Sequence, residues 1–439
     1  MNPRSEGRNH SRWLVNLALA LLAAAMTGVF AYWARQENLD ERVPEFIALA
    51  LLVGAFYLAA VCLVEKFPLG RLGLLIILGA AAIYRLALLP APPPLSEDIY
   101  RYQWEGRVQA LSINPYTVYP DAPGLQSLQN PAHPLRTGTR TPSVYPPLSE
   151  MAFGWVHTIR GYKRLFTGFD AATIVVLLGI LALLAQPLHR VLIYAWNPAV
   201  AISFAMCGHH DSLAIFTLML ASFFIIARKP LASNIFLALS FVSKFFALLF
   251  LPLFLKRSRW SYAAVFAGVV FLAYLPFLSA GRNLLHGLSD YAAGWEGNDS
   301  LFRLIRLASA SKAQAEFVAG VLIIGIVVFV VRSKMPLLRA GLFLTAGLLL
   351  LSPNAFPWYF TWTVPFLCFY PSAPWLLMTV TCVLGYSPVV AYVAGQPFKN
   401  SPFILALEYV PVIAWLAVEA LRNRPSQPEY EPPVSAARQ

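Results

Sequence analysis

The fold class is decided by residues 45–64, which read EFIALALLVGAFYLAAVCLV. After Glu45 this segment contains no charged side chain. As an α-helix rising about 1.5 Å per residue, it is long enough to cross the roughly 30 Å hydrocarbon core of a bilayer. Similar apolar runs recur along the 439-residue chain, which is 58% hydrophobic and only 12% charged. The sequence therefore predicts an all-α, polytopic transmembrane helical bundle.

The apolar runs predict about twelve full spans and one short helical hairpin. Residues 231–242 and 245–255 are each too short to span, so we expect them to form that hairpin, with Lys244 near its tip. We expect one transmembrane domain over residues 1–421, with residues 91–168 as an outer loop containing juxtamembrane helices, and a disordered cytoplasmic tail at 422–439. The expected spans lie near residues 13–33, 45–64, 72–89, 171–185, 191–207, 213–227, 260–278, 315–331, 337–351, 358–369, 375–393 and 403–420.

The basic residues predict the orientation of the bundle. The net charge is +12, and the positive side chains gather in short loops between apolar runs, as the positive-inside rule requires. No separate basic domain remains, so we exclude nucleic acid as a partner and expect membrane lipids instead. Arg4, Arg8 and Arg12 precede the first span, which places the N-terminus in the cytoplasm. An even number of spans then places the C-terminus there too.

A polar stretch follows the third expected span and a proline-rich break at residues 90–94, on the non-cytoplasmic face. We expect Ser96 to cap a helix whose first turn contains Glu97 and Asp98, where the helix dipole favours negative charge. Ionisable groups beside a bilayer are costly and usually functional, so we predict that Asp98 takes part in chemistry. Helical spacing places four polar side chains on one face: Asp98, Tyr102, Glu105 and Gln109.

Several basic side chains are candidates for holding an anion on the same face. Residues 148–159 are too short to span, so the cluster of Arg160, Lys163 and Arg164 would stay outside, against the positive-inside trend. The alternative is that residues 148–159 do cross and the cluster obeys the rule. Lys244 would be expensive in an apolar hairpin unless it meets a counter-charge, a phosphate or a water-filled cavity, although a lysine can also snorkel to the interface.

The polar stretch, read with other short motifs, resembles bacterial members of the GT-C glycosyltransferase superfamily, in the polyprenyl-phosphate-sugar-dependent, mannosyltransferase-like branch. The motifs appear in the expected order over residues 95–360. They are SEDIYRYQWEGR (96–107), INPY (113–116), YPPL (145–148), WNP (196–198), GHHD (208–211), SKF (243–245), SP (352–353) and PWY (357–359). Glu105 departs from the aspartate that the family pattern leads us to expect.

The resemblance implies a GT-C-like fold and an inverting hexosyltransferase of the bacterial inner membrane. The enzyme would move a hexose, mannose as first choice, from a polyprenyl-phosphate donor to a lipid or glycan acceptor on the non-cytoplasmic face. Asp98 matches the essential acidic residue of the first outer loop and would be the general base. The candidate substrate-binding residues are Glu97, Arg101, Tyr102, Glu105, Arg107, Arg160, Lys163, Arg164, His209, His210, Asp211, Lys244, Trp358 and Tyr359.

A divalent cation, Mg²⁺ or Mn²⁺, is a possible cofactor, because some members of the superfamily use one. His209, His210 and Asp211 carry suitable donor atoms, but vicinal side chains on a helix point in different directions and rarely chelate together. We therefore assign no metal ligand and expect His210 and Asp211 to contact acceptor or phosphate. For most aromatic residues the ordinary interfacial belt is the simpler interpretation.

The competing function is a transporter, such as a flippase for a lipid-linked sugar. Both functions predict many helices and a cationic groove for a lipid phosphate. The long outer loop with Glu97 and Asp98 favours the transferase, because a transporter has no evident need for it. No Walker A motif is present, which argues against an ATP-driven pump and fits a donor that arrives through the lipid.

Overall fold

The structure is a computed structural model that describes residues 3–67, 69–93 and 95–422. These residues fold into helices joined by loops, and within them no β-strand forms beyond isolated bridges. The last helix, α20, ends at Arg422, and the remainder of the predicted tail, residues 423–439, lies outside the described residues.

Eight helices within the described residues are long and apolar enough to cross a membrane. Two of them run through a change in helix type: α12 continues through η7 into α13, and α18 through η9 into α19. These candidate membrane-crossing elements are α1 (Pro3–Trp33), α2 (Val43–Lys66), α3 (Arg71–Leu88), α6 (Ile159–Leu183), α12 (Tyr262–Tyr274) with η7 (Leu275–Leu285) and α13 (His286–Gly294), α15 (Lys312–Arg332), α18 (Ala373–Thr381) with η9 (Cys382–Tyr386) and α19 (Pro388–Val393), and α20 (Pro402–Arg422).

The other elements are shorter. They are η1 (Leu39–Glu41), α4 (Asp98–Ala110), η2 (Pro115–Thr117), η3 (Gln126–Leu128), α5 (Pro147–Trp155), η4 (Leu188–Val191), α7 (Leu192–Ala195), α8 (Pro198–Ala201), η5 (Ile202–Met206), α9 (Asp211–Ile226), α10 (Pro230–Phe241), η6 (Phe245–Phe250), α11 (Leu251–Arg257), α14 (Leu301–Ala308), α16 (Leu337–Leu351), η8 (Pro357–Trp362) and α17 (Val364–Leu367).

The expected count of about twelve full spans is not confirmed. Apolar helices α9 and α16 are shorter than a comfortable span. The segment expected at 191–207 is broken into α7, α8 and η5, and the segment expected at 358–369 is broken into η8 and α17. Asn197 and Pro198 cause one break, because the Asn197 side chain accepts a hydrogen bond from the Val200 N–H at the start of a new helix. Such irregular backbone is tolerated at membrane depth where protein surrounds it, and residues 191–206 are almost all buried.

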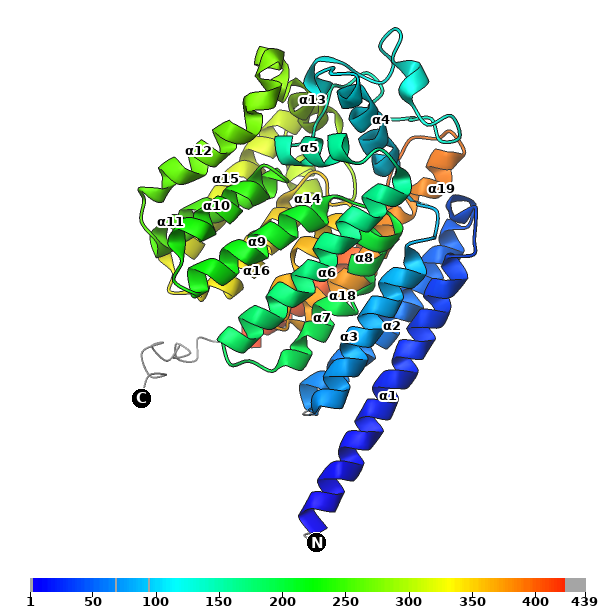
Figure 1. Ribbon diagram of the computed structural model, residues 1–439, viewed down its shortest axis with the longest axis vertical. Helices are drawn as coiled ribbons and strands as arrows, with labels where there is room; N and C mark the ends of the chain where they lie inside the picture. The colour runs from blue at the N-terminus through cyan, green and yellow to red at the C-terminus, as the bar shows by residue number, and fades with distance from the viewer. Residues whose placement is uncertain (1–2, 68, 94, 423–439) are drawn as a thin grey trace.

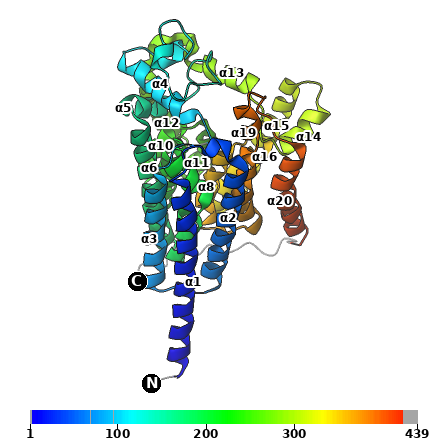
Figure 2. The same cartoon turned by 90° about the vertical axis from the view of Figure 1, so that its right-hand side faces the viewer.

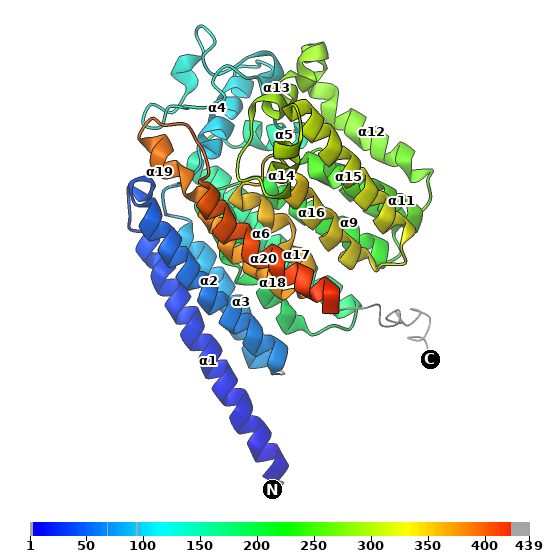
Figure 3. The same ribbon diagram turned by 180° about the vertical axis from the view of Figure 1, so that it is seen from behind.

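The spans are arranged so that the outer-loop helices form one end of the bundle. Helices α4, α5 and α13 lie together at that end, and the N-terminal end of α1 lies at the opposite end (Figure 1). Figure 2 shows α1, α2 and α3 side by side along one flank, where α1 packs against both neighbours. Seen from behind in Figure 3, α20 lies across α18 and runs toward the end opposite α4.

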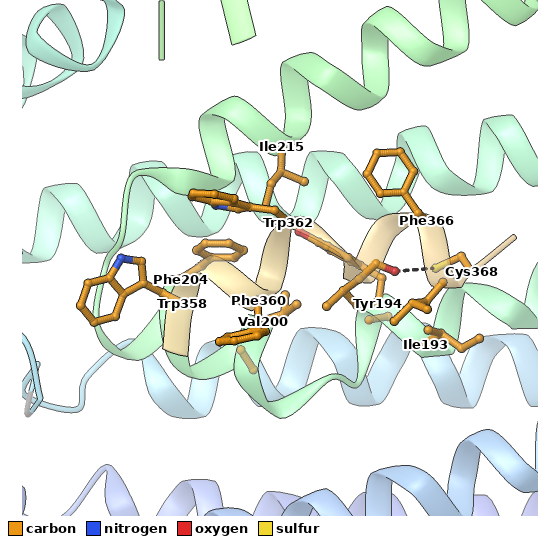
Figure 4. Packing of buried hydrophobic residues seen from close by; sticks show 14 of the residues in the cluster. Ile193, Tyr194, Val200, Phe204, Ile215, Trp358, Phe360, Trp362, Phe366 and Cys368 are labelled. Carbon is orange, nitrogen blue, oxygen red and sulfur yellow. Dashed lines mark hydrogen bonds between the residues drawn. The ribbon is translucent and has the colours of Figure 1, made fainter. Parts of the chain in front are cut away.

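The broken segments pack against each other in the centre of the bundle. Trp358, Phe360 and Trp362 from η8 lie beside Val200 and Phe204 (Figure 4). Nearby, Arg85 on α3 forms a two-pronged ion pair with Asp170 on α6, with N–O distances of 2.7 and 3.1 Å. Removing one partner of a buried pair leaves an uncompensated charge, so this contact fixes α3 against α6.

The helix that begins at Asp98 is packed onto α5. Gly106 makes this close approach possible, because a Cβ there would lie 2.4 Å from the carbonyl oxygen of Phe153. Tyr102 stacks on the Phe153 ring at a centroid separation of 4.3 Å, and the Tyr162 hydroxyl donates to the carbonyl groups of Tyr102 and Phe153. The buried aromatic cluster thus holds α4 rigidly beneath the outer loop.

Candidate active site

Asp98 lies at the first residue of α4, directly after the proline-rich break. The Ser96 Oγ accepts a hydrogen bond from the Asp98 backbone N–H at 3.2 Å, which fixes the chain as it enters the helix. Glu97, and not Ser96 as predicted, occupies the N-cap position, so the helix begins one residue later than expected and its first turn contains Asp98 but not Glu97. The Asp98 side chain is 35% exposed, and it faces a cavity.

The cavity has a volume of about 620 Å³, within the range of small-molecule sites. Glu97, Asp98, Lys244, Trp358 and Tyr359, all candidate site residues, line it. The lining is mixed: Glu37, Asp40, His133, Arg136 and Thr137 contribute polar groups, whereas Phe245, Leu248, Leu249, Leu348 and Leu349 contribute apolar ones. The apolar set lies on η6, the element that follows Lys244, and on α16, which contacts η6.

Lys244 lies at the turn between α10 and η6, as the predicted hairpin requires. Its Nζ lies 3.1 Å from Oδ1 of Asp211, which is fully buried, while the lysine side chain stays 17% exposed. The ammonium also lies above the Tyr359 ring, 4.9 Å from the centroid, which adds a cation–π attraction. Asp211 accepts a second hydrogen bond from the Trp362 indole N–H at 2.8 Å. Lys244 therefore presents a partly compensated positive charge to the cavity.

His210 supports Lys244 from behind. The Ser149 hydroxyl donates to the Ser243 carbonyl at 2.8 Å, so its oxygen accepts from Nδ1–H of His210, also at 2.8 Å. The other nitrogen, Nε2, is then an acceptor and lies 3.3 Å from Nζ of Lys244. Burial and the nearby ammonium lower the pKa of His210 well below its ordinary value, which keeps the imidazole neutral.

An unusual backbone presents the two histidines to different partners. The π-helix η5 ends at Met206, and π-helical turns are frequently found at functional sites. Gly208 then has φ +71°, and a Cβ there would lie 2.6 Å from Cδ1 of Ile99 on α4. Only glycine fits this position without strain. The loop consequently touches α4, and the His209 N–H donates to the Ser203 carbonyl at 2.9 Å.

His209 faces Asp98 rather than Lys244. Its ring stacks on the Trp358 indole at 4.1 Å with an interplanar angle of 17°. Its Nδ1 lies 3.5 Å from Oδ2 of Asp98, and the side chain is only 1% exposed. The GHHD motif therefore connects Asp98 and Lys244, with His209 at the carboxylate and His210 at the ammonium.

Glu97 connects the outer loop to the end of α18–α19. Its carboxylate accepts hydrogen bonds from the Arg136 backbone N–H at 3.0 Å and from the Tyr392 hydroxyl at 3.3 Å. The Arg136 guanidinium lies above the Tyr392 ring, 5.9 Å from the centroid. Glu97 thus both lines the cavity and holds together two segments distant in sequence.

The other candidate residues on α4 lie away from the cavity lining. Arg101 pairs with Glu105 at 2.7 Å and donates to the carbonyl groups of Gly138 and Thr141. Arg107 donates to the Leu128 carbonyl at 2.8 Å, and Tyr102 is buried in the aromatic cluster. The structure brings these side chains to the outer loop, where they hold it against α4.

A buried carboxyl pair lies at the centre of these contacts. Glu105 and Glu150 are both fully buried, and the Ser143 hydroxyl contacts both carboxyl groups. Burial, together with the neighbouring Glu105, raises the pKa of Glu150 well above its ordinary value. Glu150 therefore keeps its proton to a higher pH than an exposed glutamate would.

The basic cluster at residues 160–164 lies at the start of α6, on the same side as α4. Because α5 is only nine residues long, it does not carry the chain across a membrane. Arg160 and Arg164 are exposed and outside the cavity lining of the described structure. The Lys163 ammonium is buried and donates to the carbonyl groups of Leu88 and Ala91, at the end of α3. The structure does not bring this cluster to Asp98.

Aromatic residues form much of the cavity wall, and the sequence analysis identified only some of them. Trp358 and Tyr359 were predicted, whereas Trp362, Tyr291 and Trp295 were not. A 3₁₀ helix places residues i and i+3 above one another, and Tyr359 and Trp362 of η8 stack accordingly at 4.6 Å. The spacing of Tyr359 and Trp362 was the available signal, but the 3₁₀ geometry was not evident from the sequence.

The residues of the GHHD motif do not form a site for a divalent cation. In the described ranges no group of three or more His, Cys, Asp and Glu side chains is arranged to hold a metal ion. Both nitrogens of His210 face other partners, and Asp211 already accepts from Lys244 and Trp362. We derive no step through a cation.

Comparison with known proteins gives one family. A family model described as alpha-(1->6)-mannopyranosyltransferase, N-terminal domain, matches residues 15–257, more than half of the chain. No curated protein and no solved structure matches. The matched segment contains Asp98, the GHHD motif and Lys244, so it covers the centre of the cavity described above. The match confirms the resemblance that the sequence motifs indicated.

Proposed function

Because the chain belongs to the alpha-(1->6)-mannopyranosyltransferase family, we propose that it transfers mannose from a polyprenyl-phosphate donor to a hydroxyl of a lipid or glycan acceptor. The family and the apolar helices together indicate a membrane glycosyltransferase. One observation carries the finer proposal: Asp98 and Lys244 line the same cavity, so a carboxylate base and a phosphate-binding cation face one substrate space.

The wall around Lys244 supports a lipid-linked phosphosugar as the donor. The side chains that follow it on η6, together with Leu348 and Leu349, are apolar and suit a prenyl chain. Lys244 would act as a point charge on the phosphate, and its ammonium keeps hydrogen-bonding capacity beyond its contacts with Asp211 and His210. The Tyr359 and Trp362 rings, which stack on each other beside Lys244, give this part of the cavity an aromatic wall for the sugar.

The chemical step is a single displacement with inversion at the anomeric carbon. Asp98 accepts the proton of the acceptor hydroxyl as its oxygen attacks C1 of mannose. The new C1–O bond forms while the bond from C1 to the phosphate oxygen breaks, and the electron pair leaves with the polyprenyl phosphate. That leaving group already carries its negative charge well, so a base without a paired acid is sufficient. Lys244 stabilises the phosphate charge as it develops.

The orientation follows from the charged loops. We place the cavity on the non-cytoplasmic face of a bacterial inner membrane, with both termini in the cytoplasm and the GT-C arrangement as the fold. The basic residues near the N-terminal end of α1 support this orientation, since α4 lies at the other end of the bundle (Figure 1) and its first residue, Asp98, lines the cavity.

Purified protein incubated with radiolabelled polyprenyl-phosphate mannose and extracted membrane lipids tests the proposal. We expect label in a new product whose anomeric configuration, read by NMR, is inverted relative to the donor. Retained configuration would contradict the single displacement. No product with mannose or other hexoses, together with movement of the intact donor across a vesicle membrane, would instead favour the flippase.

A further inference from the structure

The imidazole ring of His209 is buried although it carries two polar nitrogen atoms. Within the described chain both ring nitrogens are buried, and neither makes a hydrogen bond of good geometry. An unsatisfied buried polar atom is destabilising, so such groups are rare unless they have a function. The nearest charged group is Asp98, whose Oδ2 lies 3.5 Å from Nδ1.

The position of His209 is fixed by three independent contacts. Its ring stacks on Trp358, its backbone N–H donates to Ser203, and Gly208 before it adopts a conformation that only glycine accepts easily. Asp98 is less constrained, because its side chain is 35% exposed and opens into the cavity. The rigid partner is thus the imidazole, and the movable one is the carboxylate.

We propose that His209 is the positioning residue for Asp98. Its Nδ1–H donates to Oδ2 of the carboxylate and leaves Oδ1 to accept the proton of the acceptor hydroxyl. A separation of 3.5 Å is long for this bond, but catalytic hydrogen bonds often tighten only when substrate is bound. This inference rests on the proposed role of Asp98 as the base and names the group that orients it.

The neighbouring histidine explains why the two roles are separate. His210 Nδ1–H is held by Ser149, and its Nε2 faces Lys244. One short loop therefore fixes the carboxylate through His209 and the ammonium through His210. The acceptor hydroxyl and the departing phosphate must lie on opposite sides of C1, so this loop sets the relative placement of the two groups.

Three substitutions of His209 separate positioning from packing. His209→Phe keeps a ring that stacks on Trp358 but has no donor, His209→Asn places an amide N–H near the position of Nδ1, and His209→Gln places it near Nε2. We expect His209→Phe to lower kcat roughly a hundredfold, the loss that about 1 Å of misplacement causes at a reacting group. The KM for the donor should not change. His209→Asn should recover most of kcat, and His209→Gln should not.

A packing role predicts the reverse order, with His209→Phe the most active variant, and that order would overturn the inference. Wild-type kcat in His209→Phe would overturn it too. Should the Phe variant not yield a monodisperse protein, the Asn and Gln pair decides alone, because both carry the same amide group and place its N–H at different positions. Asp98→Asn is assayed beside them. If Asp98→Asn is inactive while His209→Phe is fully active, only the positioning role of His209 is contradicted. If Asp98→Asn is fully active, the proposed role of Asp98 as the base is contradicted as well.

Discussion

Lys244 places its Nζ 3.1 Å from Oδ1 of the buried Asp211, yet the lysine keeps 17% of its side chain exposed to the cavity. A buried counter-ion stabilises the ammonium, and the remaining exposure leaves it available to an anion. The relationship connects two motifs, GHHD and SKF, which are separated by two apolar helices. It provides the physical basis for assigning the donor phosphate to this part of the wall.

Replacement of Lys244 by methionine should weaken donor binding. Hydrogen bonds to charged groups contribute about 1.5–3 kcal/mol, so we expect the KM for the polyprenyl-phosphate donor to rise about 10- to 100-fold. Lys244→Arg, which keeps the positive charge, should retain most of the affinity for the donor. This variant is the control for a loss of binding that arises only because Lys244→Met leaves Asp211 without a counter-charge. Arg164→Ala on the exposed start of α6 is the matched control. A raised KM in the control and an unchanged KM in Lys244→Met would place the phosphate at the basic cluster instead.

The buried carboxyl pair should make stability depend on pH. Burial and Glu105 raise the pKa of Glu150, so above the ordinary glutamate pKa of about 4.3 the folded protein holds a proton that the unfolded chain releases. Folding then binds protons, and stability falls as pH rises toward the folded-state pKa. We expect the melting temperature of the wild type to decline between pH 5 and pH 8. Glu150→Gln, neutral throughout, should decline less.

The control for that experiment is Glu41→Gln, which changes an exposed carboxylate on η1. It should reproduce the pH dependence of the wild type. Equal slopes for the wild type and Glu150→Gln would mean that the carboxyl pair does not retain its proton in the folded protein.

Gly208→Ala should impair both the fold and the reaction. Its φ of +71° disfavours any L side chain, and the added Cβ would meet Ile99 of α4 at 2.6 Å. Such strain costs of order 1–3 kcal/mol, and relief by movement of the loop would displace both histidines. We expect a lower melting temperature. We also expect kcat to fall at least about tenfold, because a small displacement of groups that position the reacting atoms slows the reaction. Gly28→Ala on α1, where a Cβ meets nothing, should lower neither the melting temperature nor kcat. Wild-type kcat in Gly208→Ala would show that the reaction tolerates displacement of this loop.

Much of the architecture could be predicted from the sequence because apolar run length reports membrane spans directly. The Lys244 turn, the helix near Asp98 and the short α5 all followed from charge and length, although the predicted Ser96 cap was wrong by one residue. The span count is not confirmed, because at Asn197 and in η8 the chain stays apolar but the helix breaks. Hydropathy measures transfer from water and carries no information on helix continuity, so these breaks could not be found that way.

The site was less predictable, because its parts meet only in three dimensions. Arg101, Arg107 and Lys163 have the chemistry of phosphate ligands, but they bind backbone carbonyl groups of the outer loop and α3. The separate partners of His209 and His210 depend on the positive φ of Gly208, which no local pattern revealed. Trp362 was missed because its contact with Asp211 joins residues far apart in sequence.

The most direct test of the account is the rate of mannosyl transfer by Asp98→Asn. This substitution keeps the size and shape of the side chain and removes only its ability to accept the acceptor proton. With the wild type forming labelled product from polyprenyl-phosphate mannose, we expect the variant to fold, to bind donor with unchanged KM and to lose about 10²- to 10⁴-fold in kcat. Transfer near the wild-type rate by the folded variant would contradict the assignment of Asp98 as the base.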